Sequence, residues 1–173
     1  MSATTDLLAD AFGRIREVVH EVLDGLPTEH LDVRPDPQAN SIAWLVWHLA
    51  RVQDDHVADV AGRAQVWTED GWADRFGLDL PVEDIGYGHS PDDVARVRGL
   101  STELLTGYVD AVHARTLEFV GGLADDDLAR VVDERWDPPV TLGVRLVSVI
   151  SDDLQHAGQA AYLAGMLGRG GTD

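Results

Sequence analysis

The chain has 173 residues, of which 45% are hydrophobic, so we expect residues 1–173 to form a single domain with its own core. Its formal net charge of -18 disfavours binding to nucleic acid or to an anionic membrane surface. It has no cysteine, which excludes disulfides, thiolate metal ligands and a cysteine nucleophile. Any thiol in the chemistry must therefore arrive with a bound molecule.

The sequence carries no targeting signal that we recognise. It begins Met1-Ser2-Ala3 without a charged and then apolar leader, and no apolar stretch reaches the ~20 residues of a membrane span. We therefore expect a cytoplasmic protein.

Helical spacing of apolar residues predicts a first helix from about Thr5 to Leu23, which Asp24-Gly25-Leu26-Pro27 ends. A second helix starts at Asn40 or Ser41, either of which can cap it, and ends near Gly62. Its first half is apolar on nearly every face, so we expect this helix to lie inside the molecule.

The helical periodicity fails from Arg63 to Ser90, which predicts a long loop. Aromatic residues of such a loop commonly pin it to the body, and a lid over a site is the alternative. The loop residues in question are Trp67, Trp72, Phe76, Tyr87 and His89.

Two further long helices complete the pattern. Ser90-Pro91-Asp92-Asp93 predicts the start of a helix that continues to Phe119 or Val120. After a short helical turn at 125–130 and an extended Pro138-Pro139 segment, a last helix is predicted over about 141–167. Four long helices without convincing strands predict an all-α four-helix bundle, with the long loop between its second and third helices.

Two histidines stand in otherwise apolar helical stretches. Asp152 and His156 are four residues apart, so they share one helix face and could hold one metal ion; Asp153 is the competing carboxylate. Such a pair is also typical of a solvated ion pair, and His48 alone fits a hydrogen-bonded core histidine. Together, His48, Asp152 and His156 would supply three ligands and leave coordination positions open.

The segments Trp44-Leu45-Val46-Trp47-His48-Leu49 and Asp152-Asp153-Leu154-Gln155-His156-Ala157-Gly158-Gln159 resemble the DinB-like superfamily. The superfamily includes mycothiol-dependent maleylpyruvate isomerases, bacillithiol transferases and related thiol S-transferases, and the resemblance spans the chain in helix order. It implies a DinB-like bundle that binds a divalent metal through His48, Asp152 and His156. Many members have histidine, and isomerase-like members glutamate, where this chain has the shorter Asp152.

The resemblance implies a metal-dependent thiol S-transferase or isomerase that uses a mycothiol-like thiol against a small electrophile. Two histidines and a carboxylate suit zinc and would also accept nickel, manganese or iron. The alternatives are a metal-dependent hydrolase and a non-catalytic, stress-associated metal-binding bundle. A homodimer is compatible with a helical bundle, although no heptad seam stands out.

Four further residues are candidates for the site. Arg51 and Asp55 follow His48 on nearly the same helix face and could act in catalysis by orienting a substrate, although an exterior ion pair explains them equally well. Arg145 could meet an anionic group of a cosubstrate, and Gln159 could hydrogen-bond near the site or simply pack. Of the other histidines, His20, His30, His56 and His113 are expected to be surface or packing residues.

Overall fold

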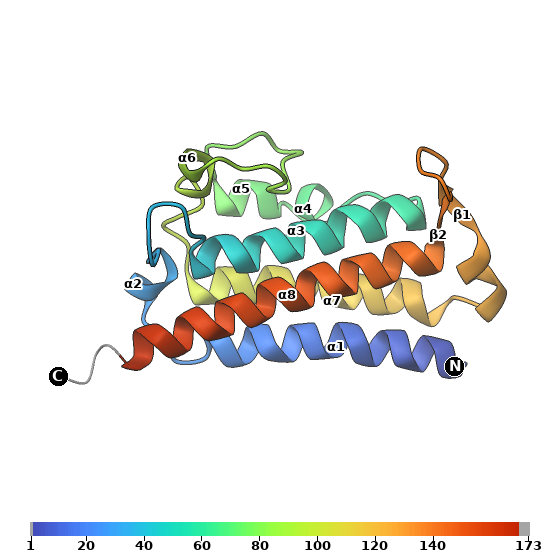
Figure 1. The fold of residues 1–173 in the computed structure, drawn as a ribbon, viewed down its shortest axis with the longest axis horizontal. Coiled ribbons are helices and arrows are strands. Elements are labelled where there is room, and N and C mark those ends of the chain that lie inside the picture. Colours follow the sequence, from blue (N-terminus) through green and yellow to red (C-terminus); the bar gives the residue numbers. More distant parts are fainter. Residues whose placement is uncertain (1, 170–173) are drawn as a thin grey trace.

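The computed structural model describes residues 2–169. Four long helices lie side by side as a bundle (Figure 1), which confirms the all-α prediction. They are α1 (Ala3–Leu23), α3 (Ile42–Ala61), α7 (Thr102–Gly121) and α8 (Leu142–Arg169). The shorter elements are α2 (Thr28–Leu31), α4 (Val66–Glu69), α5 (Trp72–Phe76), α6 (Pro91–Val94) and the 3-10 helix η1 (Asp125–Ala129).

Serine caps start three of the long helices. The side chain of Ser41 accepts a hydrogen bond from the backbone N–H of Trp44, and Ser2 and Ser101 cap α1 and α7 in the same way. Gly62 ends α3 in the left-handed conformation that glycine adopts without steric cost. The predicted bounds of the first two long helices and of the last one therefore agree closely with the structure, since their end signals are local.

The prediction of one continuous third helix from Ser90 is wrong. The Ser90 capping box starts only the short α6, and α7 begins afresh after the Ser101 cap. Gly99, with φ of +73°, lies in the break between them. The start signal at Ser90 was correct, but the turn that follows interrupts the helix.

A small hairpin precedes α8, where the sequence had predicted only an extended segment. Its strands, β1 (Val131–Asp133) and β2 (Val140–Thr141), pair in antiparallel fashion. Figure 1 shows the hairpin at the end of the bundle where α3 ends and α8 begins. It carries Asp133 to the first turns of α8, next to Arg145.

The core explains why α3 is apolar on nearly every face. The helix packs against α7 and α8, while the segment that carries α4 to α6 covers its remaining side (Figure 1). Trp67 and Phe76 are buried in this segment and pack on Tyr108 of α7, so these two aromatic residues pin the loop as expected. Within the described residues, we find no helix that is both long enough and apolar enough to cross a membrane.

Candidate metal centre

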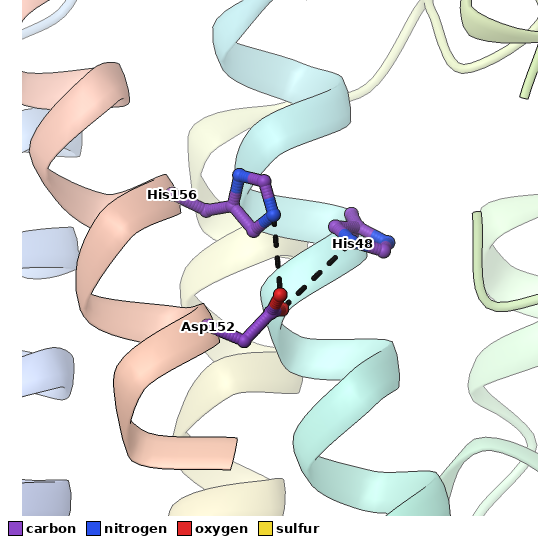
Figure 2. A group of neighbouring side chains, drawn as sticks. All are labelled: His48, Asp152 and His156. Carbon is purple, nitrogen blue, oxygen red and sulfur yellow. Dashed lines mark ion pairs between the residues drawn. The ribbon is translucent and has the colours of Figure 1, made fainter. Parts of the chain in front are cut away.

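His48, Asp152 and His156 come together in the structure. One potential ligand atom from each of the three lies within 4.8 Å of the others. Figure 2 shows His48 on α3 facing Asp152 and His156, which project side by side from α8. The i, i+4 spacing places the latter two on one helix face, and the packing of α3 against α8 brings His48 opposite them.

The hydrogen bonds of the two histidines direct their free ring nitrogens toward the carboxylate. Nδ1 of His48 contacts the backbone oxygen of Ile85, and Nδ1 of His156 lies 3.1 Å from Oε1 of Gln159. Since both oxygens can only accept, we assign the ring proton to Nδ1 in each case. The unprotonated Nε2 atoms then lie 3.9 Å (His48) and 3.7 Å (His156) from Oδ2 of Asp152.

These contacts fit a metal site. Histidine ligands characteristically donate their other ring N–H to a carbonyl or carboxylate, which fixes the orientation of the ring. Among the described residues, the buried Oδ2 of Asp152 has no hydrogen-bond partner, a costly arrangement unless a cation or proton faces it. Two ligands at about 2.1 Å in a tetrahedral site lie about 3.4 Å apart, so the three side chains need only small movements to close on an ion.

Burial keeps the His48 imidazole neutral. Its side chain is 3% exposed, and desolvation is the main cause that lowers its pKa below the ordinary value. A neutral imidazole is the form that binds a metal ion. Asp152 and His156 are more exposed, at 28% and 17% of their side-chain surface, so the open side of the group is the side that these residues line.

Asp153, the competing carboxylate, does not belong to the group. It is fully buried on the face of α8 that also carries Val149, Ala157 and Ala160, and neither of its carboxyl oxygens has a hydrogen-bond partner within residues 2–169. Burial, and secondarily the charge of Asp152, raises its pKa well above the usual range. We conclude that Asp153 is a core residue and that Asp152 faces the two histidines.

Part of the long loop, for which a lid over a site was the alternative interpretation, covers His48. The Ile85 carbonyl reaches the imidazole because Gly86 lies directly against it: a Cβ at Gly86 would be 2.6 Å from Nδ1 of His48. Gly86 also has φ of +93°, which glycine tolerates best. Trp44 stacks on the His48 ring at 4.5 Å, and Tyr87 meets its edge at 5.7 Å.

His89 anchors this loop. The indole N–H of Trp44 donates to Nδ1 of His89 at 3.0 Å, so Nε2 of His89 carries the proton and donates to Oδ2 of Asp84 at 2.9 Å. The sequence signal was Gly86-Tyr87-Gly88-His89, a glycine-rich aromatic segment in a long loop. Here the structure gives Tyr87 and His89 a place beside the site, which the pinning interpretation did not assign to them.

A cavity of about 450 Å³ opens on Asp152 and runs along α8 to Arg145. Its other walls include His56 of α3, Tyr87 of the loop and Trp136 of the hairpin turn. His56, expected to be a surface or packing residue, lines this cavity together with residues of α8 and of the hairpin. Nη1 of Arg145 lies 2.9 Å from Nδ1 of His56.

The other predicted site residues lie at different distances from the centre. Gln159 contacts His156 directly, as described. Arg51 is completely buried, and it donates to the Asp84 carbonyl, to Gln65 and to Tyr108, which ties α3 to the loop and to α7.

Asp55 accepts a hydrogen bond from the side-chain amide of Gln65 at 2.7 Å. It lines a depression beside His56 that does not include Asp152. Arg51 and Asp55 therefore have structural contacts, and catalytic roles for them stay predictions.

Comparison with known proteins agrees with this architecture. The sequence profile of the DinB superfamily matches residues 11–160. A solved structure described as the conserved protein of locus from Enterococcus faecalis is 34% identical and superposes with a TM-score of 0.88, covering 95% of this chain and 96% of that chain. No curated protein matches the chain. The fold, the matched residues and this structural neighbour together show that the chain belongs to the DinB superfamily.

Proposed function

We propose that the protein is a divalent-metal-dependent thiol S-transferase or isomerase that uses a low-molecular-weight, mycothiol-like thiol. The observation that carries the proposal is the pair of histidines whose Nδ1 atoms are engaged by Ile85 and Gln159, so that both Nε2 atoms face the unpartnered Asp152 oxygen. Two nitrogens and one carboxylate oxygen suit zinc, with nickel, manganese and iron as alternatives. A divalent ion bound there would lower the pKa of a thiol at an open position and favour the thiolate.

The residues around the centre have distinct tasks in this proposal. His48, Asp152 and His156 hold the ion, and the Gly86 loop keeps His48 in its orientation. The cavity along α8 receives the electrophile. In the transfer, the thiol loses its proton, its sulfur forms a bond to the electrophilic carbon, and the leaving group departs with the electron pair. In an isomerisation, the sulfur adds and later leaves again.

A cytoplasmic location is part of the proposal, because low-molecular-weight thiols are kept reduced in that compartment. The absence of cysteine also fits, since no thiol of the protein would compete for the metal.

The first test is the metal content of the purified, untagged protein before and after chelation and reloading with zinc or nickel. The second is thiol consumption by the loaded protein with monochlorobimane as the electrophile, using glutathione, cysteine and mycothiol in parallel. About one ion per chain together with metal-dependent consumption of one thiol supports the transferase. Metal binding together with ester hydrolysis in the absence of thiol would contradict the transferase and support a metal-dependent hydrolase. Metal binding with neither activity would favour a non-catalytic, stress-associated bundle.

A matched pair of variants identifies the centre in this test. Asp152→Asn removes the carboxylate that faces the histidines, whereas Asp153→Asn changes the adjacent, core-facing carboxyl. Loss of metal and activity in the first variant alone supports the ligand set. Equal metal content in both variants would contradict it.

A further inference from the structure

We propose that the cavity between α3 and α8 binds a carboxylate-bearing substrate, with the carboxylate at Arg145 and the reacting end about two helical turns away at the metal group. This inference rests on the proposed function and adds the substrate class to it. Arg145 is then the residue that selects substrates according to the charge and the length of the substrate.

The cavity has two chemically different ends on one helix face. Its wall on α8 consists of Arg145, Ser148, Val149 and Asp152, at positions i, i+3, i+4 and i+7. Seven residues of helix span roughly 10 Å, so Arg145 and Asp152 mark a fixed separation on a rigid element. The volume of about 450 Å³ is that of a small-molecule site.

Arg145 is held in place but is not saturated. Its side chain is 16% exposed, with Nη2 3.2 Å from Oδ2 of Asp133 and Nη1 2.9 Å from Nδ1 of His56. Among the residues that the structure describes, these contacts engage two of the five N–H donors of the guanidinium, and the fork geometry of the group suits a carboxylate. Because Arg145 donates to Nδ1 of His56, the ring proton of His56 is on Nε2, and the neutral imidazole is a donor at this end in addition to the charged guanidinium.

The charges at the Arg145 end favour an anion. Asp133 carries one negative charge and is shared by two guanidinium groups, because Arg135 also contacts it, at 2.9 Å and 2.8 Å. The three side chains together therefore carry an excess of one positive charge, in a chain whose net charge is -18. Such a local reversal of sign is what an anionic substrate needs to enter.

Besides Asp133 and Asp152, which line this cavity, two further acids lie nearby and do not line it. Asp55 and Asp59 face Arg145 and His56 from an adjoining depression of about 340 Å³, which lacks Asp152. An anion that approaches from the Asp152 side therefore meets Arg145 without passing between those two carboxylates.

The middle of the cavity is apolar. Val52 and Val149 lie on its walls, and Tyr87 and Trp136 stand at its rim with 59% and 65% of their surface exposed. Large aromatic side chains with this exposure can cover a flat or aliphatic section of a ligand. The favoured substrate is an elongated molecule with a carboxylate at one end, an apolar middle and the reacting atom at the other end.

Mercaptoalkanoates of increasing chain length test this separation directly. Calorimetric titration of the zinc-loaded protein compares each acid with its methyl ester, which keeps the thiol and removes the charge. We expect the acid to bind about ten-fold more tightly than the ester, and this preference to be largest for a chain of about six methylene groups. A chain of that length covers most of the roughly 10 Å that two helical turns span. The preference should disappear in Arg145→Met and persist in Arg14→Gln, which removes an exposed arginine paired with an aspartate on α1.

The outcomes separate this inference from the proposed function. Zinc and thiol binding with equal affinity for acid and ester would overturn the carboxylate site and leave the metal centre intact. If zinc does not bind, the proposed function fails, and phenylpropionate titrated into the metal-free protein still tests the Arg145 end. Arg145→Lys keeps a positive charge beside Asp133 and should retain part of the preference for the acid if Arg145→Met proves unstable.

Discussion

Nε2 of His48 lies 3.9 Å from Oδ2 of Asp152, although the two residues come from different helices of the bundle. In the part of the chain that the structure describes, the carboxylate oxygen has no hydrogen-bond partner, and a second imidazole nitrogen, from His156, lies 3.7 Å from it. A cluster of this kind is stable without metal only at a cost in free energy, because a buried oxygen remains unsatisfied.

Metal binding should raise the thermal stability of the protein. An ion that binds the folded state alone stabilises it by about 2.7 kcal/mol at a concentration one hundred times its dissociation constant. We expect zinc to raise the Tm of the wild-type chain and of Asp153→Asn, and to leave the Tm of Asp152→Asn nearly unchanged. Scanning calorimetry with and without zinc measures this. A similar zinc-induced rise in Asp152→Asn would show that the ion binds elsewhere.

Gly86→Ala should damage the centre through His48. The added Cβ would lie 2.6 Å from Nδ1 of His48 and within 3.2 Å of Trp44, so the loop or the imidazole must move. With the strain of a positive φ added, we expect a loss of about 1–3 kcal/mol in stability and a lower zinc affinity.

The matched control for this variant is Gly88→Ala. Gly88 also has a positive φ, of +70°, but a Cβ there would meet nothing within 4 Å. It should therefore share the backbone strain and keep the zinc affinity. Unfolding in urea gives the stabilities, and competition with a zinc chelator gives the affinities. Equal zinc affinities in the two variants would refute the role of Gly86 in positioning His48.

Gln159 should contribute to metal affinity without touching the ion. Its Oε1 atom accepts from Nδ1 of His156 at 3.1 Å and so orients the ring. We expect Gln159→Ala to weaken zinc binding about ten-fold. Gln155→Ala, one turn earlier, removes an amide that bonds the Ser151 carbonyl instead, and it should leave the affinity unchanged. Zinc titration of the wild type, Gln159→Ala and Gln155→Ala measures the three affinities, and equal affinities of wild type and Gln159→Ala would contradict the role of Gln159.

Asp133 should stabilise the fold at neutral pH and lose this effect in acid. The hydrogen bonds from Arg135 hold the pKa of Asp133 well below the ordinary value of an aspartate. A carboxyl whose pKa is depressed in the folded state adds stability above its unfolded pKa, and that stability disappears as the pH falls through the folded value. Asp133→Asn should therefore melt at a lower temperature than wild type at pH 7, by a margin that narrows below about pH 4.

The control for Asp133→Asn is Asp10→Asn on α1, which breaks an exposed i, i+4 ion pair with Arg14. Such pairs contribute little to stability, so its Tm at pH 7 should stay close to wild type. A pH-independent difference between Asp133→Asn and wild type would mean that the hydrogen-bond geometry, rather than the charge, matters at this position.

The parts of the fold that were predicted well depend on local signals. The apolar spacing of α1, α3 and α8 and the cap at Ser41 act within a few residues of the chain, so they are readable in sequence. The third long helix was predicted from the same kind of signal at Ser90. That prediction failed because the chain turns again at Gly99 and restarts at Ser101.

For the site, the sequence by itself determined that Asp152 and His156 share one face of a helix, because four residues make about one helical turn. Only the tertiary structure decided that His48 meets them, that Asp153 turns into the core, and that Ile85, 37 residues away in sequence, accepts from His48. It also decided the pairing of Asp133 with Arg145 across the hairpin. The physical reason is that these contacts depend on the paths of loops and on how whole helices pack, which no local periodicity records.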